Sequence, residues 1–182
     1  MITLTDIDVI QLLRKNNLNA DTLQENVVAK LREKGVKLAT AESCTGGLLS
    51  ERITAVSGAS DVFDFGVCTY ANEMKHKVLG VSNETLAVLG AVSVETAMQM
   101  AEGARNVSGA DLAVSTTGIA GPTGGTPEKP VGTVCFGVAD EKGVYTETEH
   151  FCREREYSRA EVRQMTAEHA MKLVLERVRG EF

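Results

Sequence analysis

The order of apolar and polar positions divides the chain into helical and strand-like stretches. Apolar residues at helical spacing predict helices over 1–20, 22–35, 45–56, 72–80, 83–90, 93–109 and 158–179. Continuous or alternating apolar runs predict strands over 36–41, 61–71, 110–118, 131–140 and 143–151. All three prolines of the chain fall inside 119–130, together with three glycines, so this stretch is predicted to be a loop.

The alternation of these elements predicts the fold class. Helices and strands follow one another through residue 118, and two strands around the turn Asp-Glu-Lys-Gly then complete the pattern. We therefore expect an α/β three-layer sandwich with a mixed, mainly parallel sheet and helices on both faces. The domain should cover 21–182, preceded by a helical extension over 1–20.

Two Gly-rich breaks, 42–47 and 118–126, fall directly after predicted strands. In open α/β sheets, ligands bind beyond the carboxyl ends of the strands. Both breaks are therefore candidates for one ligand site, provided that the strand order brings them together.

The first break, Glu-Ser-Cys-Thr-Gly-Gly, offers two candidate nucleophiles. Ser43 lies between a strand and a helix that we expect to start near Thr45. The amides of Thr45, Gly46 and Gly47 would then be free to hold an oxyanion. The more common alternative is that Ser43 or Thr45 only caps the helix. The Cys44 thiol is a rival nucleophile or, alternatively, a partly buried group pointing the other way.

A serine nucleophile needs a base, and the chain offers few. The three histidines, His76, His150 and His169, form no recognised triad pattern, and the motif Gly-x-Ser-x-Gly is absent. Lys75 can serve if its surroundings lower its pKa, and Tyr70 lies nearby at a strand end. The alternatives are a solvated helix face for Lys75 and packing at the rim for Tyr70.

The Gly/Pro loop and the last helix supply the other polar candidates. The loop amides, with Thr117, Thr123 and Thr126, are suited to a phosphate or ribose, but no Gly-Lys-Ser/Thr follows, so this is not a Walker loop. Arg159 and Arg163 are four apart and share a helix face on which they could clamp an anion. The alternatives are a wide turn and ion pairs with Glu156, Glu161 or Glu168.

Composition and cysteine use narrow the class of protein. The net charge is −6 at pH 7, so direct nucleic-acid binding is not expected. No apolar run reaches the roughly 18 residues of a membrane span, and the N-terminus lacks a signal-peptide pattern, so we expect a cytoplasmic protein. Cys44, Cys68, Cys135 and Cys152 form no Cys-x-x-Cys pair, so we expect no metal site and free thiols, with Cys68 and Cys135 buried.

Five motifs together resemble the CinA C-terminal domain family, the nicotinamide-nucleotide amidases also called PncC. They are AESCTGGLL, TYANEMK, GAVS, TGIAGPTGGTPEKPVGTV and SRAEVR, and the resemblance covers roughly residues 23–178. It implies an α/β domain that hydrolyses the carboxamide of nicotinamide mononucleotide to nicotinate mononucleotide and ammonia. It also implies that no metal or organic cofactor is needed and that the protein is a homo-oligomer.

The resemblance assigns a role to each matching residue. The nucleophile falls on Ser43, the catalytic lysine on Lys75 and the active-site tyrosine, a positioner of the proton relay, on Tyr70. The amides near Thr45, Gly46 and Gly47 would hold the oxyanion. The substrate-binding residues would be Thr117, Gly118, Gly121, Gly124, Gly125, Thr126, Arg159 and Arg163.

The segment FCREREYSR departs from the family pattern. Relatives usually show Phe-x-Gly-Asp-Arg there, whereas this chain lacks the glycine and carries about four more residues. Arg153 and Arg155 are therefore alternatives to Arg159 as the arginine that binds phosphate. Three other functions stay open: an inactive relative that binds a nucleotide or partner, a DNA-uptake or repair accessory acting through protein contacts, and an amidase for another small amide.

Overall fold

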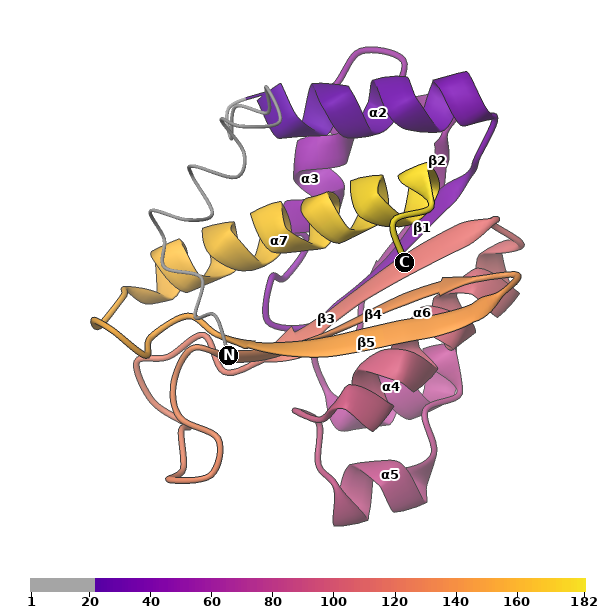
Figure 1. The fold of residues 1–182 in the computed structure, drawn as a ribbon. Helices are drawn as coiled ribbons and strands as arrows, with labels where there is room; N and C mark the ends of the chain where they lie inside the picture. Colours follow the sequence, from indigo (N-terminus) through magenta and orange to yellow (C-terminus); the bar gives the residue numbers. More distant parts are fainter. Residues whose placement is uncertain (1–21) are drawn as a thin grey trace.

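The runs predicted as strands form one five-stranded sheet in the computed structural model, which describes residues 22–182 (Figure 1). The strands are β1 (Leu38–Glu42), β2 (Phe63–Cys68), β3 (Leu112–Gly118), β4 (Thr133–Asp140) and β5 (Gly143–His150), in the order β2-β1-β3-β4-β5. β1 pairs in parallel with β2 and β3, whereas β4 pairs antiparallel with β3 and β5. Four strands thus point one way and β4 the other, which confirms the mixed sheet.

Helices cover both faces of this sheet, as the alternating pattern predicted (Figure 1). One layer holds α2 (Leu23–Lys34), α3 (Leu48–Thr54) and α7 (Arg159–Arg179), and the other holds α4 (Asn72–Leu79), α5 (Asn83–Val88) and α6 (Val94–Ser108). A short 3-10 turn, η2 (Ala59–Asp61), precedes β2. The helix predicted over 1–20 lies outside the described residues. Between residues 22 and 182, no helix is long and apolar enough to cross a membrane.

Two apolar cores, one on each face, follow from the alternation of side chains along the strands. Leu38 of β1 packs into the core formed with α2, α3 and α7. Ala39 and Ala41 face the other core, which also contains Leu79 of α4 and Met100 of α6. β1 is an interior strand of the sheet and is buried throughout. The residues that follow its carboxyl end therefore begin at a buried edge of the sheet.

Serine hydroxyls cap the starts of three helices. Ser158 and Glu161 form a capping box at the start of α7, and the Ser93 hydroxyl accepts the Thr96 amide at the start of α6. The Ser82 hydroxyl caps α5, because it accepts a hydrogen bond from the Thr85 amide.

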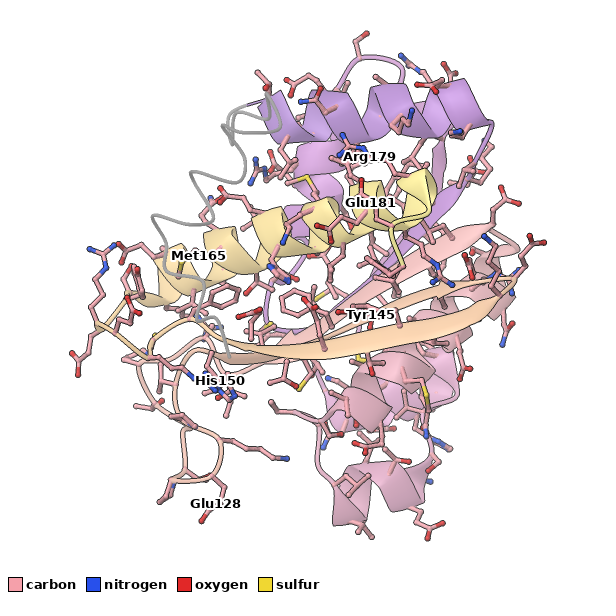
Figure 2. All side chains as sticks on the ribbon, viewed as in Figure 1. Glu128, Tyr145, His150, Met165, Arg179 and Glu181 are labelled. Atoms are coloured by element: carbon pink, nitrogen blue, oxygen red, sulfur yellow. The ribbon has the colours of Figure 1, made fainter. Side chains whose placement is uncertain are left out.

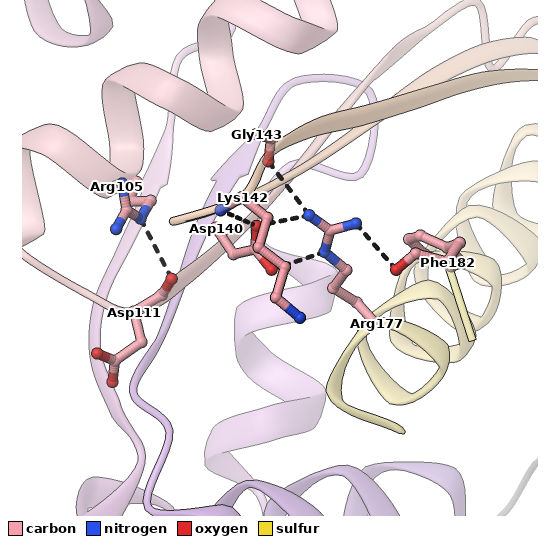
Figure 3. Close-up of polar contacts among 7 residues, drawn as sticks. All are labelled: Arg105, Asp111, Asp140, Lys142, Gly143, Arg177 and Phe182. Carbon is pink, nitrogen blue, oxygen red and sulfur yellow. Dashed lines mark hydrogen bonds and ion pairs between the residues drawn. The ribbon is translucent and has the colours of Figure 1, made fainter. Parts of the chain in front are cut away.

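The C-terminal end of α7 is anchored to the turn between β4 and β5 (Figure 3). Arg177 donates from Nε and Nη2 to the two carboxylate oxygens of Asp140 at 2.7 and 2.5 Å, and from Nη1 to the Phe182 carbonyl at 3.0 Å. Burial works against ionisation of Asp140, but the hydrogen bond and charge of Arg177 hold the pKa of its carboxyl below the usual value. This ion pair lies at the amino ends of the parallel strands, opposite the edge where Ser43 lies.

Candidate active site

Ser43 and Lys75, 32 residues apart in sequence, meet at the carboxyl end of β1. Lys75 lies in the first turn of α4, and its Nζ is 2.9 Å from the Ser43 Oγ. The same Nζ donates to the carbonyls of Thr69 at 2.8 Å and Tyr70 at 3.3 Å. Lys75 is 1% exposed and Ser43 is 8% exposed. The predicted serine and lysine thus form a buried, hydrogen-bonded pair, and the solvated-face alternative for Lys75 is wrong.

The surroundings of Lys75 favour its neutral form. Burial lowers the pKa of its amine below the usual 10.5, and the nearby thiols of Cys44 and Cys68 only partly oppose this. Within residues 22–182, no acidic side chain forms an ion pair with Lys75. A neutral amine that donates its two N–H groups to the two carbonyls keeps its lone pair for the Ser43 hydroxyl proton. The geometry is therefore suited to a general base.

The buried carboxylate of Glu42 organises the turn that carries Ser43. It accepts the amides of Gly47, Leu49 and Ser50 at 2.9, 3.1 and 2.8 Å, and the Ser50 hydroxyl at 2.5 Å. These amides belong to the start of α3, where the helix dipole also favours a negative charge. Sequence reasoning missed Glu42, although a glutamate at a strand end, just before the glycines of a helix start, was the available signal.

The observed structure of the turn differs from the sequence prediction in two ways. The helix starts at Leu48 and not near Thr45, because Gly46 and Gly47 have positive φ values of 62° and 95°. The Gly47 amide donates to Glu42, and the Gly46 amide donates to the Ser43 carbonyl at 3.1 Å. Neither is free to hold an oxyanion in this arrangement. The Thr45 amide donates to no backbone carbonyl of residues 22–182, and with the Cys44 amide it faces the Cys44 thiol, which is a weak acceptor.

The cysteines around the turn are not competing nucleophiles. Cys44 is buried, and burial raises the pKa of its thiol to about 12, although the amides of Cys44 and Thr45 act in the opposite direction. The thiol stays protonated at neutral pH. Cys135 is buried as predicted, but Cys68 is exposed, because it ends the edge strand β2. None of the four cysteines forms a disulfide with another described residue, as expected.

Arg159, at the start of α7, links two other predicted site residues. Its Nη2 donates to the Tyr70 hydroxyl at 2.8 Å, and its Nη1 donates to the Gly121 carbonyl at 3.0 Å. The Tyr70 ring is 61% exposed. The Tyr70 hydroxyl is thus bound to Arg159 and not to the Ser43–Lys75 pair, which Tyr70 contacts through its backbone carbonyl. This arrangement does not support the expected proton-relay role for the tyrosine hydroxyl.

Arg163 has a different position from Arg159, although the two share a helix face. It donates from Nε and Nη2 to the Thr45 carbonyl at 3.1 and 2.7 Å, so it supports the turn that carries Ser43. The alternative, ion pairs with Glu156, Glu161 or Glu168, is wrong within residues 22–182, where neither arginine forms an ion pair and Glu168 pairs with Arg52 at 3.3 Å. The alternative phosphate ligand Arg155 stacks its guanidinium 4.2 Å from the centre of the Tyr157 ring.

The Gly/Pro loop leaves the same sheet edge as the Ser43 turn, because β1 and β3 are neighbours. Its first predicted residues are structural. The buried Thr117 hydroxyl donates to the Ala91 carbonyl at 2.7 Å, and Gly118 ends β3 where a side chain would collide with Thr133 and Val134. These contacts explain the residue types without a ligand.

The outer part of this loop projects away from the sheet, with Glu128 near its tip (Figure 2). Gly124, Gly125 and Thr126 are exposed, and Thr126 closes a local turn with Lys129. The Lys129 Nζ donates to the carbonyls of Leu89 and Val92 at 2.8 and 2.7 Å and so fixes the loop to the segment before α6. Sequence reasoning did not single out Lys129.

One group of side chains in the described part of the chain has metal-ligand geometry. The ligand atoms of Glu147, Glu149 and His169 lie within 4.8 Å of one another, between β5 and α7. His169 and Glu147 already hydrogen-bond each other, and the Tyr145 hydroxyl donates to Glu147 at 2.6 Å. The hydrogen bond and charge of His169 lower the pKa of Glu147 despite burial, which raises it. These satisfied contacts describe a hydrogen-bonded cluster that ties α7 to β5.

Comparisons with known proteins bear on the family. The CinA C-terminal domain matches residues 20–178. A CinA-like protein of Geobacter sulfurreducens is 53% identical over 137 residues, which is 75% of this chain but 33% of the relative. The chain spans about a third of the length of the curated relatives it matches.

Solved structures agree with this match. The competence/damage inducible protein CihA from Agrobacterium tumefaciens is 40% identical, with a TM-score of 0.81 over 86% of this chain and 93% of that one. A CinA superfamily protein from Klebsiella pneumoniae is 34% identical, with a TM-score of 0.83 over 89% of this chain and 99% of that one. By sequence and by structure, this chain belongs to the CinA C-terminal domain family.

Proposed function

We propose that this protein is an amidohydrolase that converts nicotinamide mononucleotide to nicotinate mononucleotide and ammonia through an acyl-enzyme on Ser43. The observation that carries the proposal is the 2.9 Å contact between the Lys75 Nζ and the Ser43 Oγ, in a setting that lowers the pKa of the lysine. A buried lysine with no carboxylate partner is costly for a fold, and such groups cluster at functional sites. The choice of the carboxamide substrate rests on the resemblance to the nicotinamide-nucleotide amidases.

The first half-reaction follows from the hydrogen bonds of the pair. Neutral Lys75 takes the Ser43 hydroxyl proton while the oxygen attacks the carboxamide carbon. The tetrahedral oxyanion is held by the Cys44 and Thr45 amides, because it is a much stronger acceptor than the Cys44 thiol that they face, whereas the amides of Gly46 and Gly47 donate to a carbonyl and a carboxylate. The protonated Lys75 then gives its proton to the leaving nitrogen. The carbon–nitrogen bond breaks, and ammonia departs.

The charge distribution around Ser43 supports an anionic substrate. Within residues 22–182, Arg159 and Arg163 donate only to neutral oxygens, of Tyr70, Gly121 and Thr45. A guanidinium with neutral partners exchanges them readily for a phosphate, which it binds by charge-assisted hydrogen bonds. Arg159 is exposed and lies beside the Gly/Pro loop, so we assign it to the 5′-phosphate. Arg163 is assigned to holding the Ser43 turn.

The test is ammonia release from nicotinamide mononucleotide by the purified protein and by two serine variants. We expect release by the wild type, loss of release with Ser43→Ala, and unchanged release with Ser57→Ala, an exposed serine outside the site. A Ser43→Ala variant that still binds the nucleotide but turns over at the wild-type rate would refute the acyl-enzyme. A folded wild type that releases ammonia only from other small amides would move the substrate assignment and keep the Ser43 chemistry.

A further inference from the structure

One buried hydroxyl next to the Ser43–Lys75 pair has no partner. Thr69 is 1% exposed, and its Oγ1 makes no hydrogen bond with any residue from 22 to 182. Buried hydroxyls are nearly always satisfied, because burying one without a partner is unfavourable. Neighbouring threonines of the same sheet edge follow that rule, since Thr45 pairs with Thr116 at 2.8 Å and Thr117 donates to Ala91 at 2.7 Å. The free hydroxyl of Thr69 therefore needs an explanation.

The backbone of Thr69 is fixed directly between β1 and the lysine. Its amide donates to the Glu42 carbonyl at 2.9 Å, which continues the β1–β2 ladder by one residue. Its carbonyl accepts from the Lys75 Nζ at 2.8 Å. The hydroxyl itself is not bound to Lys75, whose Nζ contacts Ser43, Thr69 and Tyr70 only through the oxygens already described.

Strand alternation places the Thr69 side chain on the face where the reaction would occur. Phe65 and Val67 of β2 pack against the core formed with α4 and α6, and two residues further along lies Thr69. On β1, Ala39 and Ala41 pack into the same core, and two residues further along lies Ser43. The two hydroxyl residues therefore leave adjacent strands on the face that α4 covers, where Lys75 lies.

We propose that the Thr69 hydroxyl binds the water that hydrolyses the acyl-enzyme, an assignment that rests on the proposed function. After ammonia leaves, water must enter beside Lys75, because the same base serves both half-reactions. The water oxygen bonds to the acyl carbon, and its proton passes to Lys75. The bond from the acyl carbon to the Ser43 Oγ then breaks, and Lys75 returns the proton to Ser43. A buried water needs two or more polar partners, and Thr69 supplies one that no protein group uses.

The test separates the two half-reactions with Thr69→Val, which keeps the branched shape and removes the hydroxyl. With nicotinamide mononucleotide we expect kcat to fall about 10- to 100-fold, in the range for positioned groups in general acid–base steps. One equivalent of ammonia should still appear in a rapid burst. Intact mass spectrometry should then show the acyl group on Ser43. Thr69→Ser, which restores a hydroxyl, should recover most of the rate.

A matched control distinguishes this role from a structural one. Thr166→Val removes another fully buried threonine hydroxyl, but one that donates to the Val162 carbonyl at 2.7 Å. If the Thr69 hydroxyl serves deacylation, acyl-enzyme should accumulate with Thr69→Val and not with Thr166→Val. We also expect Thr69→Val to melt at or above the wild-type temperature, because it removes an unsatisfied group. Wild-type kcat in Thr69→Val, or equal slowing of both half-reactions without acyl-enzyme, would overturn the proposal.

A second substrate keeps this result separate from the identity of the natural amide. p-Nitrophenyl acetate can acylate an activated serine, and the burst of nitrophenol followed by a slower steady state measures deacylation directly. If the wild type releases no ammonia from nicotinamide mononucleotide but shows this burst, the substrate proposal fails and the Thr69 test still runs. If neither compound acylates Ser43, the acyl-enzyme itself is refuted and the Thr69 assignment falls with it.

Discussion

The arginines at the two ends of α7 differ in the charge of their hydrogen-bond partners. At the C-terminal end, Arg177 faces the Asp140 carboxylate at 2.5 and 2.7 Å, and both side chains are largely buried. At the N-terminal end, Arg159 and Arg163 donate hydrogen bonds only to neutral carbonyl and hydroxyl oxygens of the described part of the chain. The helix thus carries compensated charge at the amino ends of the parallel strands and uncompensated positive charge at their carboxyl ends.

This difference separates stability from function within one element. A paired, partly buried arginine fixes the helix to the β4–β5 turn and has little left to offer a ligand. Arginines with neutral partners contribute less to holding the fold, but they leave a positive region beside the buried Lys75 and Ser43. We interpret the paired end as the anchor of the domain and the unpaired end as its binding edge. Three substitutions test this division: Lys75→Met beside the binding edge, Arg159→Ala on it, and Arg177→Met at the anchor.

The largest effect is expected for Lys75→Met. The substitution removes the proposed base and should lower ammonia release about 100- to 10,000-fold, the usual contribution of a positioned acid–base group. Lys77→Met, on the exposed side of the same helix where Lys77 pairs only with Glu73, should leave the rate unchanged. Activity in Lys75→Met within tenfold of the wild type would remove Lys75 from the mechanism.

The same variant has a pH-dependent effect on stability with a defined sign. The pKa of Lys75 is lowered in the folded protein, so between that value and 10.5 the unfolded chain binds more protons than the folded one. Wild-type stability should therefore rise with pH across this window, and Lys75→Met should lack the rise. Urea unfolding at several pH values measures this dependence. The gain in the free energy of unfolding of Lys75→Met over the wild type should be greatest below the folded-state pKa of Lys75 and should be lost above pH 10.5.

A smaller effect is expected for Arg159→Ala. Loss of a charge-assisted hydrogen bond of about 1.5–3 kcal/mol should reduce kcat/KM for the mononucleotide about 10- to 100-fold, mainly through KM. Arg153→Ala and Arg155→Ala should have little effect, because Arg155 stacks on Tyr157 and neither was found beside Tyr70 and Gly121. A larger KM effect at Arg155 would assign the phosphate to Arg155 in place of Arg159.

The smallest effect on activity is expected for Arg177→Met. It should leave ammonia release unchanged while lowering the free energy of unfolding by about 1–2 kcal/mol, because it strands the largely buried Asp140 carboxylate. Urea denaturation measures this loss. Lys30→Met, at a surface pair with Glu33, should leave the free energy of unfolding nearly unchanged and serves as the control. Loss of activity without loss of stability in Arg177→Met would contradict the division of α7 into anchor and binding edge.

The sequence predicted the elements and their packing well, because apolar periodicity and capping residues are local signals. The boundaries of β3, α6 and α7 lie within two residues of the prediction. The family motifs also directed attention to Ser43 and Lys75. The periodicity and motifs together therefore determined the fold class, the family and the candidate chemistry of this chain.

Other features depended on how distant segments meet. The strand order brought Lys75 to Ser43, and burial there, not the lysine itself, lowers its pKa. Glu42 binds the Gly47 amide, one of the three amides that the sequence assigned to the oxyanion, because a carboxylate at a strand end reaches the helix start across the turn. Arg159 and Arg163, equivalent by spacing, received different partners. Spacing determines which residues share a face, whereas only the tertiary contacts determine which polar groups are already satisfied and which stay free for chemistry.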